Sequence, residues 1–315
     1  MRPGCCDRPF ASIVTGQEAR GPPCAAPAWR IRDAAPARRC PGAQTRTVPP
    51  LVSAAADPEA ARSDRIVARE AGVHTAWLRD LGIPLDPHPP PEAFVLVERD
   101  GALDLRPPGE LDRPGIGAVF PPDRGRAPGA RHPLVRAFGR DLDPIFDLTA
   151  GLGADAYRLA AAGHRVFASE RHPAVYAVLA TGWARDRDAG RVPREVAERL
   201  AFRWAEGADV VAGLEGEGIG VYVDPMYPPI GRGKALPRRE LQVLRRLLGP
   251  ARDATGLVEA ARARVARVVV KRPHRAPPLV PGADFEIASK LVRFDVYLDP
   301  ARARRKRESS GKGAE

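Results

Sequence analysis

Cysteine is absent from the 315-residue sequence after position 40. The four cysteines, Cys5, Cys6, Cys24 and Cys40, include no Cys-x-x-Cys pair. This distribution excludes a cysteine nucleophile and a zinc–thiolate site from the rest of the chain, and it gives little support to zinc binding near the N-terminus. No metal is expected. The scarcity of cysteine fits a reducing compartment.

Long hydrophobic runs are also missing. No apolar stretch approaches the roughly 18 residues that a membrane-spanning helix needs, and the N-terminus has no apolar segment typical of a signal peptide. We therefore expect a cytoplasmic protein without a membrane partner. The hydrophobic content of 44% is sufficient for a sizeable core.

Most of the positive charge lies near the two ends of the chain. Of the net charge of +11, residues 1–50 contribute +5 and residues 300–315 contribute +4, which leaves +2 for residues 51–299. The overall charge therefore says little about the substrate of the central part. Residues 1–50 are rich in Pro, Arg, Ala and Gly without a sustained period, so this extension and the basic tail are expected to be disordered.

Residues 51–143 are expected to form a small α+β domain followed by a basic loop. Apolar residues at helical spacing predict a helix over 57–82. Two alternating segments predict strands at 94–98 and 102–106, joined by a turn at 99–101. Residues 107–143 are rich in Pro, Gly and Arg and predict a loop.

Residues 144–299 show strands that alternate with helices. The strands are expected at 145–148, 165–170, 202–204, 220–224, 267–271 and 291–298, and the helices at 155–162, 173–185, 195–200, 238–248 and 257–263. This alternation predicts an α/β fold of the Rossmann-like kind, with a mostly parallel sheet covered on both faces. Ligands of such sheets bind at the carboxyl ends of the strands, where the strand order reverses.

The first candidate site is the turn Asp147-Leu-Thr-Ala-Gly-Leu-Gly153, between a predicted strand and a predicted helix. Gly151 and Gly153 would let the backbone approach a ligand, and amides at a helix start favour a carboxylate. Asp147 and Asp155 are candidates to face the positive charges of S-adenosylmethionine. Glu170, at the end of the next strand, is suited to accept hydrogen bonds from ribose hydroxyls. The turn lacks the Gly-x-Gly-x-x-Gly spacing of dinucleotide sites, which disfavours NAD.

The second candidate site is Asp224-Pro-Met-Tyr-Pro228, after the predicted strand that ends at Val223. An exocyclic amine is a poor nucleophile, and its attack is helped by acceptors for its N–H groups. The Asp224 carboxylate and the Pro225 carbonyl can serve as acceptors, and the Tyr227 ring can stack on a base removed from its helix. The two sites together indicate methyl transfer to an amine nitrogen.

These segments, with Val268-Val-Val-Lys-Arg-Pro273, resemble the ribosomal RNA small-subunit methyltransferase J family over roughly residues 60–298. The resemblance implies a class I methyltransferase that uses S-adenosylmethionine to methylate N2 of a guanine in 16S ribosomal RNA, free or in the small subunit. It places cofactor contacts on Ala154, Asp155, Glu170, Arg171, Glu206, Gly207 and Asp224. Two positions depart from the family: Ala154 replaces an arginine, and Glu206-Gly207 replaces two small hydroxyl residues.

Two basic segments are candidates for RNA contact. One is the segment 124–136, which the resemblance suggests, with Arg124, Arg126 and Arg131; the other contains Lys271, Arg272 and Arg275 at a predicted strand end. The alternatives are a methyltransferase acting on adenine N6 or on a protein side chain, an NAD-dependent oxidoreductase, and a non-catalytic RNA-binding protein on the same fold.

Overall fold

The computed structural model describes residues 66–69, 74–122, 132–227, 238–249, 251 and 253–299. The ends expected to be disordered, 1–50 and 300–315, lie outside these ranges, as do Arg124, Arg126 and Arg131 and the C-terminal Pro228 of the second motif.

The N-terminal unit contains a three-stranded sheet in the order β1-β2-β3. Its strands are β1 (Ile66–Arg69), β2 (Phe94–Arg99) and β3 (Ala102–Arg106). Strand β1 is parallel to β2, and β2 is antiparallel to β3. The predicted hairpin is confirmed: Asp100 and Gly101 form its tip with φ of 51° and 76°, the sign that matches the twist of the two strands.

The predicted helix over 57–82 is wrong for residues 66–69, which form a strand; the only helix described in this region is α1 (Thr75–Asp80). Residues 66–69 form a strand because of a tertiary contact. Residues 66–69 pair with 94–97 of β2, and their side chains alternate between two clusters, with Ile66 and Ala68 in the main core and Val67 beside Val95. A short apolar run fits both periods, and the neighbouring strand selects the extended one.

A seven-stranded sheet forms the larger unit, in the order β6-β5-β4-β7-β8-β10-β9. Its strands are β4 (Ile145–Asp147), β5 (Val166–Glu170), β6 (Leu200–Trp204), β7 (Gly216–Val223), β8 (Val265–Pro273), β9 (Phe285–Ala288) and β10 (Val292–Leu298). Strands β6, β5, β4, β7 and β8 are parallel to one another. Strand β10 runs antiparallel to its two neighbours, β8 and β9. The strand order reverses between β4 and β7, which confirms the predicted α/β sheet.

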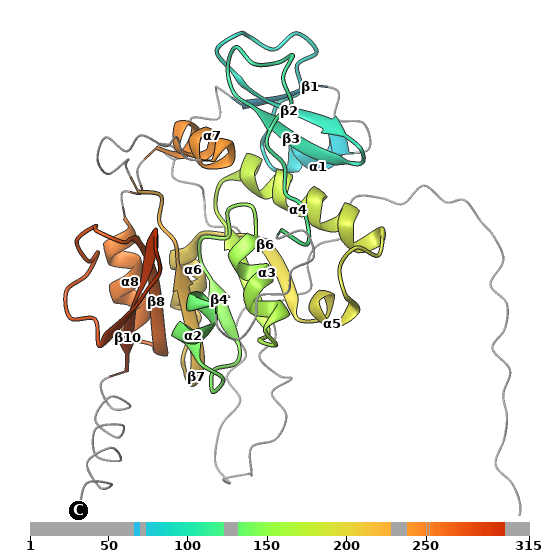
Figure 1. Cartoon of the computed structure of the whole chain (residues 1–315). Coiled ribbons are helices and arrows are strands. Elements are labelled where there is room, and N and C mark those ends of the chain that lie inside the picture. The colour runs from blue at the N-terminus through green and yellow to red at the C-terminus, as the bar shows by residue number, and fades with distance from the viewer. Residues whose placement is uncertain are drawn as a thin grey trace, which may run out of the picture.

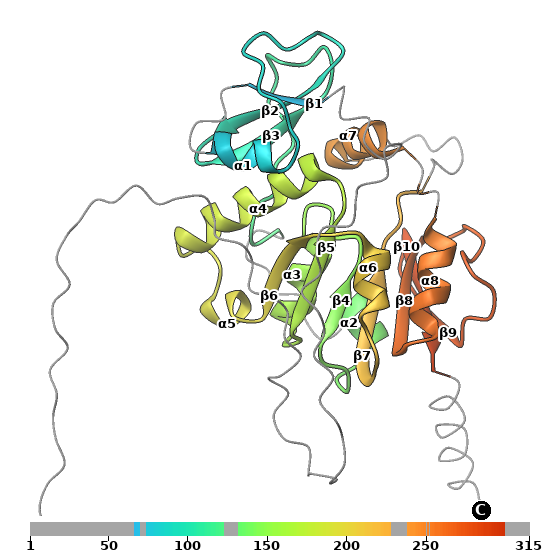
Figure 2. The ribbon, with the colours of Figure 1, turned by 180° about the vertical axis from the view of Figure 1, so that it is seen from behind.

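Helices cover both faces of this sheet (Figures 1 and 2). The helices of the larger unit are α2 (Pro133–Phe138), α3 (Ala154–Ala161), α4 (Pro173–Asp188), α5 (Arg194–Ala197), α6 (Gly207–Ala212), α7 (Arg239–Leu248) and α8 (Ala254–Arg262). Helices α2 and α3 lie on one face, and α6 and α8 on the other. Successive side chains of β7 point to opposite faces of the sheet. Tyr222 packs in the core beneath α2 and α3, and Val221 and Val223 pack in the core beneath α6 and α8.

Three elements were not predicted. Helix α2 lies within the segment expected to be a loop and packs on the C-terminal strands of the large sheet. Helix α6 and strand β9 fall in stretches with little periodicity. Helix α5 is also shorter than expected, because Leu200 begins β6 by pairing with Val166.

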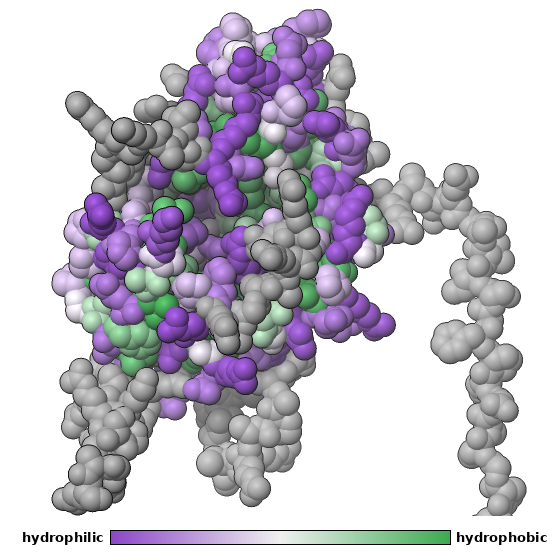
Figure 3. Space-filling model, viewed as in Figure 1, coloured by the Kyte–Doolittle hydropathy of each residue, from purple (hydrophilic) through white to green (hydrophobic). Residues whose placement is uncertain are grey.

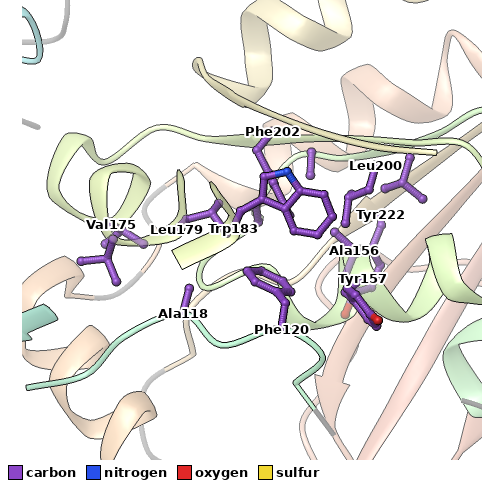
Figure 4. Packing of buried hydrophobic residues seen from close by; sticks show 14 of the residues in the cluster. Ala118, Phe120, Ala156, Tyr157, Val175, Leu179, Trp183, Leu200, Phe202 and Tyr222 are labelled. Atoms are coloured by element: carbon purple, nitrogen blue, oxygen red, sulfur yellow. The ribbon is translucent and has the colours of Figure 1, made fainter. Parts of the chain in front are cut away.

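Helix α4 lies between the two sheets (Figures 1 and 2) and carries part of an aromatic cluster (Figure 4). The Phe120 and Trp183 rings meet edge to face with centroids 5.1 Å apart, and Trp183 lies 5.4 Å from Phe202. These arrangements are favourable for aromatic pairs. Segment 118–120 is also tied to the helix, since the Phe120 amide donates to the buried Asp186 carboxylate at 2.7 Å.

A single buried hydroxyl joins α4 to β3. Thr181 Oγ1 accepts a hydrogen bond from the Leu103 amide at 3.0 Å and donates to the Ala177 carbonyl at 2.8 Å. Thr181→Val keeps the shape but leaves the Leu103 amide unpaired, so we expect a loss of stability of about 1–3 kcal/mol. Thermal denaturation should show a larger drop in midpoint for Thr181→Val than for Thr181→Ser, which keeps the hydroxyl and loses only one buried methyl group. Equal midpoints for the two variants would contradict this role.

None of the helices in the described ranges is long and apolar enough to cross a membrane. Hydrophilic residues cover most of the face seen in Figure 3, interrupted by smaller hydrophobic areas.

Candidate active site

A cavity of about 310 Å³ opens at the carboxyl ends of β4, β5 and β7, where the strand order reverses. Its floor is the turn between β4 and α3, and its sides include the residues that follow β5, β6 and β7. This is the position at which open α/β sheets bind ligands.

Side chains of β4 and β5 hold the glycine turn in place. The Thr149 amide donates to Asp147 Oδ1 at 2.9 Å, and the Gly151 amide donates to Glu170 Oε2 at 2.9 Å. The other oxygen of Glu170 accepts from the His172 amide at 2.8 Å. Glu170 therefore orients the turn from the neighbouring strand, while carboxylate oxygens carry enough lone pairs to accept further hydrogen bonds from a ligand.

The floor of the cavity is rich in carboxyl groups. Burial raises the pKa of Asp147 to about 8, helped by the nearby Asp155, Asp224 and Glu170 carboxylates. Burial also raises the pKa of Glu170. Because ionised carboxylates are costly to bury without counter-charges, the cavity favours a cationic ligand.

Lys271 of β8 bridges two of these carboxylates. Its Nζ lies 2.8 Å from Asp155 Oδ2 and 2.8 Å from Asp224 Oδ2. Asp155 also accepts from the Tyr222 hydroxyl at 2.8 Å and pairs with Arg158 at 2.7 Å. Burial alone would raise the pKa of Asp155, but Lys271 and Arg158 outweigh it and lower the pKa.

Asp224 stands directly after β7, at the rim of the cavity, with 32% of its side chain exposed. Its amide donates to Thr149 Oγ1 at 2.7 Å, which fixes its backbone to the glycine turn. Burial raises the pKa of the Asp224 carboxyl, and Lys271 offsets part of this rise. Among the described residues, hydrogen bonds to the carboxylate reach only Oδ2, so Oδ1 can accept from a ligand.

Pro225 and Tyr227, the other two predicted residues of the motif, differ in their placement. Pro225 is buried and lines the cavity. Tyr227 is set back from it: its hydroxyl donates to the Lys271 carbonyl at 2.6 Å, and the Arg272 guanidinium lies 4.0 Å from its ring centroid. The Arg272 guanidinium therefore covers one face of the Tyr227 ring, and a base cannot stack on that face.

Helix α7 provides an apolar wall through Leu241, Leu244 and Leu248. These positions follow one helical face. The same helix contacts the N-terminal unit, because Arg239 forms a 2.8 Å ion pair with Glu110 and Arg246 lies over the Phe94 ring. The N-terminal unit thus helps to place one wall of the cavity.

The structure gathers most of the predicted residues around this one cavity. Those that line it are Asp147, Gly151, Ala154, Asp155, Glu170, Arg171, Glu206, Gly207, Asp224, Pro225 and Lys271. Gly153 and Tyr227 do not. Gly153 lies on the core side of the turn. It has a φ of 80°, and the rings of Phe120 and Phe202 are close to the position that a Cβ would take.

The predicted RNA contacts of Lys271 and Arg272 need correction. Lys271 is committed to two carboxylates, and Arg272 is buried, donating to the Pro277 carbonyl at 2.9 Å and covering Tyr227. The paired Lys271 and the buried Arg272 are therefore poorly placed to bind a phosphate. Arg275, two residues beyond β8, is exposed and remains a candidate.

Sequence reasoning missed the parts played by Tyr222, Arg158 and Thr149. Tyr222 lies within an apolar strand and is fully buried, so its hydroxyl had no visible partner in the sequence. Arg158 stands three residues after Asp155, a spacing that places both on one side of a helix, and this signal could have revealed the pair.

This fold and cavity define a class I S-adenosylmethionine-dependent methyltransferase. The chemistry of the lining fits that cofactor: carboxylates suit its ammonium and sulfonium groups, and apolar side chains suit its adenine ring. In the part of the chain that the structure describes, no group of three or more His, Cys, Asp or Glu side chains is placed to hold a metal ion.

Comparisons with known proteins agree with this class. Residues 123–299 match a family model described as "Putative SAM-dependent methyltransferase". A crystal structure of a SAM-dependent methyltransferase from Neisseria gonorrhoeae aligns with a TM-score of 0.57 and 29% identity, covering 75% of this chain and 96% of that one.

Curated relatives narrow the assignment. Proteins named ribosomal RNA small subunit methyltransferase J from Escherichia coli O1:K1 and Edwardsiella ictaluri are 35% and 37% identical over 67% of this chain and 88% of theirs. The chain therefore belongs to the ribosomal RNA small subunit methyltransferase J family and uses S-adenosylmethionine.

Proposed function

We propose that the protein transfers the methyl group of S-adenosylmethionine to the exocyclic N2 of a guanosine in 16S ribosomal RNA. The observation that carries this proposal is the position of Asp224, at the rim of the cofactor cavity, with one carboxylate oxygen left to accept a hydrogen bond. The names of the relatives support ribosomal RNA of the small subunit as substrate.

The cavity residues would hold the cofactor through complementary chemistry. Glu170 would accept hydrogen bonds from ribose hydroxyls, and Glu206, after β6, would accept from the adenine amino group. Asp147 and Asp155 line the cavity, and one of them would face the ammonium or the sulfonium group. The Ala154 departure removes a side-chain contact, although its backbone still lines the cavity.

S-adenosylmethionine supplies an electrophilic methyl group on a sulfonium. Asp224 would accept an N–H of the guanine amine and stabilise the positive charge that builds on the nitrogen as the N–C bond forms. The C–S bond breaks in the same step, and the released proton passes to the Asp224 carboxylate or to water. Holding the reactants in line supplies much of the acceleration, so no covalent enzyme intermediate is needed.

Contact with RNA phosphates would come from exposed cations that follow the strands. Arg275 follows β8 and Arg171 follows β5, and both are exposed at the carboxyl edge of the sheet. Cations at these positions would orient the RNA through its phosphates, and guanine recognition would come from the cavity itself.

Two measurements test the proposal. Calorimetry should show binding of S-adenosylmethionine and no binding of NAD; binding of NAD alone would end the methyltransferase assignment. Mass mapping of 16S ribosomal RNA from a strain lacking the gene should show the loss of one N2-methylguanosine, restored by the wild-type gene. Loss of a methylated adenosine, or no change in the RNA, would exclude guanine N2 as the target.

A further inference from the structure

We infer that Lys271 is a positioning residue for methyl transfer: it orients the Asp224 carboxylate toward the acceptor amine. The inference rests on the proposed function of the cavity. Under this inference, Lys271 positions Asp224 and does not contact RNA.

The geometry of Lys271 carries the argument. One ammonium group lies 2.8 Å from a carboxylate oxygen of α3 and 2.8 Å from a carboxylate oxygen of the residue after β7. Its side chain is 26% exposed, which leaves it mostly enclosed by these partners. Because Lys271 contacts only Oδ2 of Asp224, it holds that oxygen in place while the other oxygen stays available.

Hydrogen bonds to the glycine turn hold the backbone of Asp224. The Asp224 amide donates to Thr149 Oγ1, and the Thr149 amide donates to Asp147. With its backbone held by the glycine turn and its carboxylate by Lys271, Asp224 has little freedom to turn away from the cavity. A preorganised acceptor avoids reorientation during the reaction, which is where such groups contribute most.

The charges around Asp224 give the inference its test. Titratable groups that act on it come from every neighbouring element, and they are Lys271 of β8, Asp155 of α3, Asp147 of β4, Tyr222 of β7 and Tyr227 of the following loop. Burial raises the pKa of Asp224, Lys271 lowers it, and Asp155 raises it. Lys271 and Asp155 therefore act in opposite directions.

The experiment is the pH profile of kcat on ribosomal RNA with saturating cofactor. If the carboxylate form of Asp224 is the active one, kcat rises as the pH passes its pKa. Lys271→Gln retains hydrogen-bond donors but removes the charge, so the midpoint should move to higher pH and the plateau should fall about 10- to 100-fold. Lys271→Arg keeps the charge and should retain the wild-type midpoint. Asp155→Asn should move the midpoint to lower pH.

Two controls isolate the effect. Lys290→Gln removes the same charge from an exposed turn and should leave the midpoint unchanged. In an Asp224→Asn background, measured by single turnover, Lys271→Gln should no longer move any midpoint, even though Asp147 still titrates there.

An unchanged midpoint in Lys271→Gln, with a higher KM for RNA and a weaker salt dependence, would overturn the inference and return Lys271 to the phosphate-contacting role. Should Lys271→Gln fail to fold, a midpoint in Asp155→Asn that is equal to or above the wild-type value would overturn it as well. Absence of methylation by the wild-type protein would instead refute the proposed function.

Discussion

Asp224→Ala is expected to lower kcat for methylation of ribosomal RNA by about 10²- to 10³-fold, the scale observed when a group that stabilises developing charge is removed. The fold should be retained, because Asp224 is one-third exposed and Lys271 keeps its second partner, Asp155. Turnover with purified 16S ribosomal RNA and labelled cofactor measures the loss, and thermal denaturation checks the fold.

A matched variant separates charge from shape at this position. Asp224→Asn preserves the size of the side chain and one acceptor oxygen, so its loss of kcat should be smaller than that of Asp224→Ala. Calorimetry should show that both variants still bind S-adenosylmethionine, since the glycine turn and Glu170 remain in place. Near-normal turnover in Asp224→Ala would remove this carboxylate from the mechanism.

The largest expected effect on stability is that of Gly153→Ala, below the cofactor turn. Gly153 has a φ of 80°, and an added Cβ would lie 2.7 Å from Leu179 Cδ1 and 2.9 Å from Phe120 Cζ. Backbone strain of about 1–2 kcal/mol would add to an overpacking cost of about 1–3 kcal/mol. We expect a thermal midpoint lower by on the order of 10 °C and weaker cofactor binding, because the displaced turn carries Gly151.

Gly190→Ala is the control for this prediction. Gly190 also has a positive φ, of 68°, but nothing lies within 4 Å of its Cβ position. Its substitution should therefore cost only the backbone strain and leave cofactor binding unchanged. Equal drops in the thermal midpoint of the two variants would show that the contacts of Gly153 with Leu179 and Phe120 add nothing to the cost of the substitution.

The cofactor turn and the Asp224 motif could be predicted because their signals are local. A strand, two glycines and a helix follow each other within the 17 residues 145–161, and a parallel sheet brings the ends of its strands to one edge. The residues after β4, β5, β6 and β7 therefore meet around one cavity, as the structure shows. Tyr227 was also expected beside this cavity, but its hydroxyl bonds the Lys271 backbone and draws it away.

Where the sequence pattern was short or ambiguous, prediction failed. Residues 66–69 suit a helix and a strand equally, and pairing with β2 decided between them. Helix α2 lies in a segment rich in Pro, Gly and Arg, which predicts a loop. Its apolar residues are buried by packing on the C-terminal strands, and this packing is not visible in the sequence.

The sequence by itself determined the class of fold, the family and the chain segments that build the cavity, because these depend on periodicity and on motifs of neighbouring residues. Tertiary structure alone decided which charges are paired. Lys271 looked like a surface cation beside two arginines, yet it meets Asp224 and Asp155, which are 47 and 116 residues away in the chain. The environment of a long ionisable side chain depends on partners that only folding brings within 3 Å, and no local pattern records them.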